Sequence, residues 1–279
     1  NLDVSATSSS INFTQGSVTI GSTSQSYYHF ENGEIANISN LNWDLAFDAS
    51  GYGSGIRING ASGTELYVYP NGDISSWSTV DTAGSSSWNI IHNSDTSWGM
   101  GAFNRTKVPN DGFDLGWGVY SMITHFITGD SIHVIKLSDG NFKKLLIEQL
   151  AGGTYYFKYA DIDGSNEVID SISKSDYAGK NFGYYSLQSN QAIDREPSND
   201  WHIVLTKYIS EVAPGMPYGV TGVLTNAGLE TAKIEGVDVN SVNNESAYNN
   251  DLYNSRINNI GWDWKSYDMI AESYNIQDS

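Results

Sequence analysis

The sequence contains no cysteine. The chain therefore forms neither disulfides nor thiolate metal sites, and its stability must come from the burial of apolar surface. That surface is available, because the chain has 8 Trp, 18 Tyr and 9 Phe.

Basic residues are scarce as well. The chain has 14 Lys and Arg against 32 Asp and Glu, which gives a formal net charge of -18. Such a chain repels polyanions unless its basic residues gather on one face, and no run of Lys or Arg indicates such a face. The composition therefore excludes nucleic acid as a partner.

Long apolar runs are also missing, since none approaches the roughly 20 residues that cross a bilayer. No transmembrane segment is predicted. The first residues, Asn-Leu-Asp-Val, lack the basic and apolar regions of a signal peptide, which is typical of a mature, exported N-terminus. Few charges, many aromatics and abundant Gly, Ser, Thr and Asn favour an extracellular or outer-cell-surface protein over an acidic cytosolic domain.

The strongest positive feature is an internal repeat. Segment 42–47 (Asn-Trp-Asp-Leu-Ala-Phe) resembles segment 200–205 (Asp-Trp-His-Ile-Val-Leu), and a tyrosine pair precedes each. Segments 55–60 and 116–122 have their own matches at 222–227 and 261–267. Matching blocks in the same order indicate a unit present twice. We therefore predict two tandem lobes, residues 1–175 and 176–279, with a boundary near 173–182.

Alternating apolar residues and frequent turn signals predict an all-β fold made of antiparallel sheets. Trp43, Leu45 and Phe47 are expected on one face of a strand, because strand side chains alternate. Asn-Gly and Asp-Gly dipeptides, which favour tight hairpin turns, occur at 32–33, 59–60, 71–72, 139–140 and 163–164. The best predicted hairpins are 131–137 with 141–149 and 154–160 with 167–172.

Two stretches lack any regular period. Segment 77–113 and its counterpart 238–259 are rich in polar residues and predict long irregular loops, where binding residues often lie.

The second lobe is expected to be incomplete. Strands follow the block at 116–122 in the first lobe, whereas the chain ends soon after the matching block at 261–267. We expect an open sheet edge there, covered by self-association or by a strand donated from outside these residues. The alternative is that segment 267–276 or 11–20 seals the edge.

Three segments carry a family resemblance: 43–47 (Trp-Asp-Leu-Ala-Phe), 134–142 (Val-Ile-Lys-Leu-Ser-Asp-Gly-Asn-Phe) and 218–226 (Tyr-Gly-Val-Thr-Gly-Val-Leu-Thr-Asn). On these the chain resembles the HmuY family of Bacteroidota surface and secreted proteins, in particular its larger members with a type IX secretion sorting domain. The resemblance implies an all-β, exported protein. For the founding members it implies haem capture through two axial side chains.

Haem is thus one candidate cofactor. A bis-histidine haem site needs two imidazoles on opposite sides of the iron and an apolar pocket between them. His92 lies in the long loop and His125 just before a predicted strand, so these two are the candidate ligands. His133 alternates with apolar neighbours and is expected to face solvent. The competing interpretation for each is an ordinary core or surface imidazole.

Calcium is a second candidate. Asp161, Asp163, Ser165 and Glu167 place oxygen donors at alternate positions around Gly164, and hard cations prefer oxygen ligands. The competing interpretation, a hairpin turn capped by its own side chains, is favoured by turn chemistry.

Trp77, Trp88 and Trp98 lie in the long loop, where indoles stack on sugar rings when exposed and otherwise pack in a core. No nucleophile elbow, metalloprotease motif or Ser/His/Asp context is recognisable. The sequence therefore predicts no catalytic residues and a non-catalytic protein, structural or adhesive or ligand-capturing, with haem binding and carbohydrate binding as the specific alternatives.

Overall fold

The computed structural model describes residues 23–198, 200–213, 215–236, 252–268, 270–271 and 273–276. Segment 11–20, named above as an alternative seal of the sheet edge, and most of the predicted loop 238–259 lie outside these residues. Strands joined by loops and short 3₁₀ helices make up the regular structure of the described part, and every strand pairing is antiparallel. The prediction of an all-β fold is confirmed.

The elements in chain order are β1 (Ser24–His29), β2 (Gly33–Ser39), β3 (Leu45–Asp48), β4 (Ile56–Ile58), η1 (Gly60–Ser62), β5 (Glu65–Val68), η2 (Ile74–Thr79), η3 (Ser85–Ser87), η4 (Ala102–Asn104), β6 (Gly118–Tyr120), β7 (Ile127–Gly129), β8 (Ile132–Lys136), β9 (Phe142–Ala151), β10 (Thr154–Asp161), β11 (Val168–Ser173), η5 (Lys174–Tyr177), β12 (Phe182–Ser186), β13 (Gln191–Ile193), β14 (Ile203–Ala213), β15 (Met216–Thr225), β16 (Lys265–Asp268) and β17 (Ser273–Ile276).

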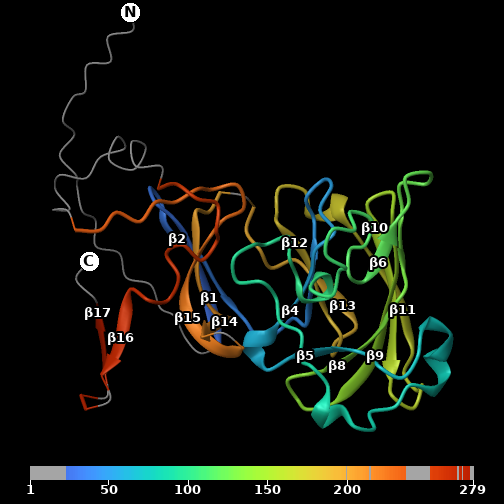
Figure 1. Ribbon diagram of the computed structural model, residues 1–279. Coiled ribbons are helices and arrows are strands. Elements are labelled where there is room, and N and C mark those ends of the chain that lie inside the picture. Colours follow the sequence, from blue (N-terminus) through green and yellow to red (C-terminus); the bar gives the residue numbers. More distant parts are fainter. Residues whose placement is uncertain are drawn as a thin grey trace, which may run out of the picture.

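Three sheets follow one another across the molecule (Figure 1). Sheet A has the strand order β15-β14-β1-β2, and sheet B has the order β13-β12-β3-β4. Sheet C is seven-stranded, with the path β11-β10-β9-β7-β6 and with β8 joining β5 to β9. The hairpin β16-β17 pairs only with itself.

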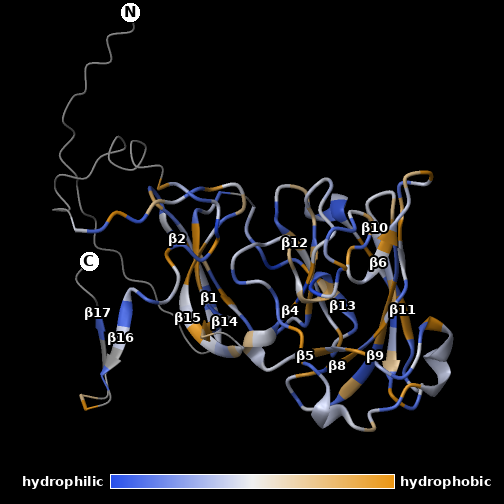
Figure 2. Cartoon of the chain, in the orientation of Figure 1, coloured by the Kyte–Doolittle hydropathy of each residue, from blue (hydrophilic) through white to orange (hydrophobic). Residues whose placement is uncertain are grey.

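The largest core lies between sheets B and C. Leu45 and Phe47 of β3 meet Tyr155 and Phe157 of β10 there, and Trp117 is fully buried beside them. Apolar residues concentrate on these strands (Figure 2). This aromatic core replaces the disulfides that the chain cannot form, since buried apolar area is the main favourable term in folding.

The internal repeat is expressed as an exchange of strands. Strand β1, with the first tyrosine pair, pairs with β14, and β12, with the second pair, pairs with β3. The registers match, because Tyr28 lies opposite Ile203 just as Tyr185 lies opposite Leu45. Sheets A and B are therefore two copies of one arrangement, and each takes strands from both sides of the predicted boundary at 175/176.

Two asparagines occupy equivalent places in this arrangement. Asn59 follows β4 and donates through Nδ2 to the carbonyl of Trp43 at 3.0 Å, and Asn226 follows β15 and donates to the carbonyl of Trp201 at 2.8 Å. The backbone N–H groups of the two residues donate to the carbonyls of Asp44 and His202. Each side chain therefore ties the start of the central strand to its neighbour.

Asn59→Ala and Asn226→Ala are each expected to lower the free energy of unfolding by about 1–3 kcal/mol, because each leaves a buried carbonyl without its donor. Urea unfolding followed by circular dichroism measures this change. Asn71→Ala, in an exposed turn, is the control and should change stability by less than about 0.5 kcal/mol. Equal effects of all three variants would contradict the structural role of the pair.

The outer edge of β15 is covered in part by the chain itself. Val223 and Gly261 exchange two backbone hydrogen bonds, of 2.8 and 3.1 Å, and Thr225 donates to the carbonyl of Ile257. Residues 257–261 thus cover part of the edge that we expected to be open, in the way that the alternative assigned to 267–276 or 11–20. Strand donation or self-association at the remainder of this edge stays a prediction.

The local predictions are largely confirmed. The hairpins β8-β9 and β10-β11 form at the predicted positions, so segment 142–150 is a strand. The long loop between β5 and β6 contains 3₁₀ turns and two residues in isolated bridges, Ile91 with Leu66 and Asp114 with Val119. Among the described residues, no helix has the length and apolar character needed to cross a membrane.

Candidate ligand-binding site

A cavity lies between sheet A and the face of sheet B that points away from the large core. We call it the inter-sheet cavity. Alternation along the strands puts its walls in place: Ala46 of β3 and Tyr184 of β12 face the cavity, whereas Leu45 and Tyr185 face sheet C. Trp43, expected beside Leu45, lies with Ala46 instead, because it precedes the first residue of β3.

The cavity is small. Its total space is about 800 Å³ when the part open to solvent is included, and the centres of water molecules can occupy about 80 Å³. Since one water needs roughly 10–15 Å³ on the latter measure, the cavity holds several waters or a ligand of similar extent.

Two matching aromatic pairs form the walls. Tyr27 packs edge-on against Trp201 with ring centroids 4.9 Å apart, and Tyr184 packs edge-on against Trp43 at 5.1 Å. These pairs are equivalent under the repeat, because each joins a tyrosine of one block to the tryptophan of the other. Edge-to-face packing of this kind is a favoured aromatic geometry.

Trp98 reaches into the cavity from the long loop and joins the two halves. Its ring lies edge-on to Trp201, at 6.5 Å, and to Phe182, at 5.8 Å. Its Nε1 donates to the carbonyl of Thr225 at 2.8 Å. The indole is thus fixed against both sheets.

Arg57 holds the loop that carries Trp98. Its Nη1 donates to the carbonyls of Ser97 and Trp98, and its Nη2 donates to that of Ser94. The guanidinium lies 5.0 Å from the Trp98 ring centroid, a cation–π distance. Burial lowers the pKa of Arg57 to about 10. Both guanidinium η-nitrogens are satisfied, so Arg57 is a positioning residue.

Arg195 differs from Arg57, because only its Nη2 has an acceptor, the carbonyl of Ser39 at 2.7 Å. Its Nε and Nη1 are buried without a hydrogen-bond partner, and the residue is 8% exposed. The guanidinium lies over the rings of Tyr184, at 4.8 Å, and Trp43, at 5.5 Å. This wall therefore presents unused donors.

Three further polar atoms in the cavity wall are buried without a partner: Trp201 Nε1, the Tyr208 hydroxyl and His92 Nδ1. Burial raises the pKa of Tyr208 and lowers that of His92, so both stay neutral near pH 7. Buried polar groups without a partner are rare in folded proteins, and their concentration here makes the cavity the candidate binding site.

Glu196 is the buried acid of the site. Its carboxylate accepts from the backbone N–H groups of Asn181 and Phe182, at 3.1 and 3.2 Å, and from the Tyr184 hydroxyl at 3.3 Å. Burial outweighs these bonds and raises its pKa to about 7. Its charge is therefore only partial near neutral pH.

The predicted haem ligands lie in different surroundings. His92 lines the inter-sheet cavity, whereas His125 lies in an exposed turn between β6 and β7, where its Nδ1 meets the Tyr120 hydroxyl at 2.7 Å. No hydrogen bond or ring contact joins the two in the described part of the chain. His133, expected to face solvent, is fully buried against Phe103.

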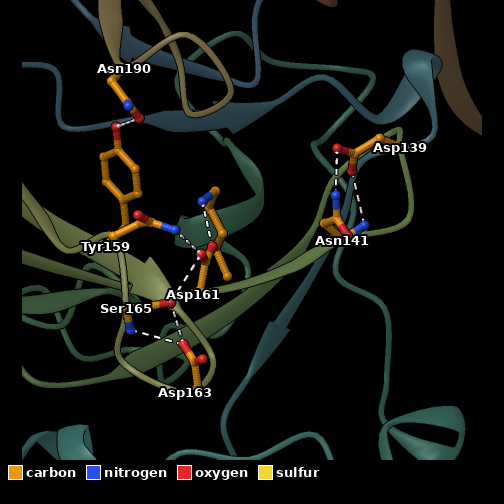
Figure 3. Close-up of polar contacts among 9 residues, drawn as sticks. Asp139, Asn141, Tyr159, Asp161, Asp163, Ser165 and Asn190 are labelled. Atoms are coloured by element: carbon orange, nitrogen blue, oxygen red, sulfur yellow. Dashed lines mark hydrogen bonds and ion pairs between the residues drawn. The ribbon is translucent and has the colours of Figure 1, made fainter.

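Three of the four predicted calcium ligands, Asp161, Asp163 and Ser165, lie together in the turn between β10 and β11 (Figure 3). Asp161 pairs with Lys143 at 2.8 Å and accepts from Asn166, and Asp163 accepts from the backbone and hydroxyl of Ser165. Glu167 accepts from Trp77 Nε1. Among the residues described, no group of three or more His, Asp or Glu side chains is arranged to hold a metal ion. These contacts favour the side-chain-capped turn over calcium.

Of the three candidate stacking tryptophans, only Trp98 lies in the cavity. Trp77 is held between Lys144 and Lys158 at cation–π distances of 5.0 and 4.8 Å, and Trp88 packs edge-on against Tyr67 and Tyr69. Both therefore cover a second small core beside sheet C.

The sequence did not single out Arg195, Glu196 or Trp201 as site residues. Arg195 and Glu196 lie in the run Asp-Arg-Glu-Pro at 194–197, which has the composition of a surface turn. The repeat was the one usable signal, because it places Trp201 at the position equivalent to Trp43.

Comparison of the chain with protein-family models, with curated proteins and with solved structures finds no match.

Proposed function

We propose that this protein captures a small, ring-bearing ligand in the inter-sheet cavity without changing it chemically. One observation carries the proposal: tryptophans and tyrosines line a cavity whose walls also contain buried, unpartnered polar atoms of Arg195, Trp201 and Tyr208. Ligand sites are typically apolar and aromatic with a few convergent polar groups.

A non-catalytic role is supported by the acids of the cavity. Glu196 is engaged by two backbone N–H groups, and Asp95 accepts from the Ser210 hydroxyl and from Asn258. General acid–base catalysis needs such a group within reach of the substrate proton, whereas these carboxylates serve the protein's own donors. Capture therefore fits the chemistry of the walls better than turnover.

The location of the protein in the organism is proposed from the sequence. Composition and the motifs shared with the HmuY family support an exported protein of the Bacteroidota type, at the cell surface or outside the cell. A structural or adhesive role would use the free edges of the sheets and does not account for the unpartnered atoms of the cavity. Ligand capture is therefore preferred over a structural or adhesive role.

Carbohydrate binding is the form of capture that the position of Trp98 favours, since indole faces stack on sugar rings and Trp98 is fixed in the cavity wall. Haem capture has one supporting observation, the unpartnered Nδ1 of His92 in the same wall. The small volume of the cavity argues against a porphyrin.

Trp98→Ala is expected to weaken binding of a ring-bearing ligand at least about tenfold, because stacking and burial of an indole contribute more than about 1.4 kcal/mol. The measurement is a thermal-shift and calorimetric screen of monosaccharides, small aromatic acids and haemin. Trp88→Ala is the matched control, since Trp88 packs among tyrosines outside the cavity.

Equal losses in the two variants, or no binding of any probe to the unaltered protein, would contradict the proposal. A sharp haemin absorption band that His92→Ala removes would favour haem over a small ring.

A further inference from the structure

If the inter-sheet cavity captures a ring-bearing ligand, as proposed above, the free donors of Arg195 bear on which class of ring it accepts. The guanidinium is more than nine-tenths buried, and its Nε and Nη1 lack a partner. A buried cation without a counter-charge is costly, and the cost falls when an anion or strong acceptor meets it. The site is therefore incomplete without an acceptor.

Among the described residues, no acidic side chain forms a hydrogen bond or ion pair with Arg195, and Glu196 interacts with it through electrostatics alone. The ion pairs found there all use lysines: Lys136, Lys143, Lys158, Lys180 and Lys233. Glu196 is next to Arg195 in sequence, but its oxygens accept from Asn181, Phe182 and Tyr184. The unpartnered Nε and Nη1 of Arg195 are thus left for a group that the cavity receives.

The balance of basic and acidic residues in the cavity wall also differs from that of the whole chain. Acidic residues outnumber basic ones by 32 to 14 overall. Two arginines, Arg57 and Arg195, are buried in the wall, which also contains the acids Asp95 and Glu196, and burial keeps Glu196 partly protonated near pH 7. A low-dielectric cavity with this local excess of positive charge favours a negative ligand group.

The surroundings of Arg195 also prepare it for binding. The guanidinium is held over Tyr184 and Trp43 and is anchored by the Ser39 carbonyl. A donor fixed in advance loses little conformational entropy when it binds. Trp98 and Trp201 line the same cavity, so a ligand with a ring next to its anionic group fits both features at once.

We infer that the ligand is a small cyclic carboxylate, with its carboxylate on Arg195 and its ring between Trp43, Trp98 and Trp201. The unpartnered Trp201 Nε1 and Tyr208 hydroxyl provide further hydrogen bonds to substituents of the ring. Sugar acids and aromatic acids share this chemistry, and the experiment separates them.

The test is isothermal titration calorimetry of the full chain with matched pairs of probes. Glucuronate and galacturonate are compared with glucose and galactose, and benzoate with benzyl alcohol. We expect an acid to bind at least about tenfold more tightly than its neutral partner, because its carboxylate accepts charge-assisted hydrogen bonds from Arg195 that the neutral group cannot match. Preference for uronates identifies a sugar acid, and preference for benzoate identifies an aromatic acid.

Arg195→Gln is expected to lower the affinity for the acid about ten- to hundredfold and to leave the affinity for the neutral partner within about threefold. Arg256→Gln, which removes an exposed arginine and the same charge, is the control and should leave both affinities unchanged. If Arg195→Gln fails to fold, Arg195→Lys keeps the charge and should give an intermediate loss for the acid.

The outcomes separate the two proposals. Equal binding of acids and neutral rings, or an equal loss of both in Arg195→Gln, overturns the carboxylate inference and leaves small-ring capture standing. Failure of every probe to bind the unaltered protein counts against capture itself.

Discussion

Replacing Trp201 by alanine is expected to lower the free energy of unfolding by about 3–5 kcal/mol, the usual cost of truncating a buried tryptophan. Trp201 is 2% exposed and packs against Tyr27 and Trp98 between sheets A and B. The variant loses the indole that joins the first strand to the second half of the chain. Because the same ring lines the cavity, ligand binding should be lost as well.

Two comparison variants make this prediction specific. Trp201→Phe keeps a ring against Tyr27 and removes the unpartnered Nε1, so its cost should be well below that of alanine. Trp43→Ala, at the equivalent position of the repeat, removes a half-buried indole whose Nε1 donates to Asn40, and should cost less than Trp201→Ala. Urea unfolding followed by far-ultraviolet circular dichroism compares them, and a larger loss for Trp43→Ala would contradict the ranking.

The repeat could be predicted from the sequence, whereas the pairing of its strands could not. The four blocks indicated a duplicated unit, and in the structure Tyr27 and Tyr184 lie at equivalent registers opposite Val204 and Ala46. The blocks did not show that each tyrosine strand pairs with the tryptophan strand of the other copy. Local alternation fixes which side chains share a face, but it does not choose the partner strand.

The prediction that His133 faces solvent was wrong for a different reason. Its place between Ile132 and Val134 indicated a strand with one exposed face, yet β8 is buried on both faces. Ile132 and Val134 meet the small core under Trp77 and Trp88, and His133 packs against Phe103 on the other side. Coverage of a second face depends on the long loop, whose path has no periodic signal.

The candidate site could not be predicted from the sequence for a related reason. Arg195 gains its role from the rings of Tyr184 and Trp43 and from the Ser39 carbonyl. Ser39 is 156 residues away in sequence, and only the exchange of strands brings the two together. Nothing in the sequence around Arg195, a charged residue after a short strand, indicates these contacts.

Glu196 is expected to contribute a loss of stability as the pH rises from 4.5 to about 7. Burial raises the pKa of its carboxyl from 4.5 to about 7, against the lowering effect of Asn181, Phe182, Tyr184 and Arg195. The folded state therefore holds this proton more tightly than the unfolded state does. The stabilisation is complete below pH 4.5 and is lost as the pH rises through 7.

The size of the effect follows from the two pKa values. The interval from 4.5 to about 7 corresponds to about 3 kcal/mol. Glu196→Gln mimics the protonated acid and removes the titration, so the difference in free energy of unfolding between the two proteins should change by about 3 kcal/mol from pH 4.5 to 7.5. Taking this difference cancels the other carboxylates, which titrate alike in both proteins.

His133 provides an internal check on the sign. Burial lowers its pKa to about 4, so its contribution is present above pH 6.5 and is lost as the pH falls through 4. Urea unfolding of both proteins at closely spaced pH values should therefore show the acid-side loss in each of them. The gain from His133 between pH 4 and 6.5 is common to both proteins and offsets the loss from Glu196 in the unaltered one, so the loss appears in the difference between the two curves. Parallel curves from pH 4.5 to 7.5 would mean that Glu196 is ionised in the folded state throughout, which contradicts the prediction.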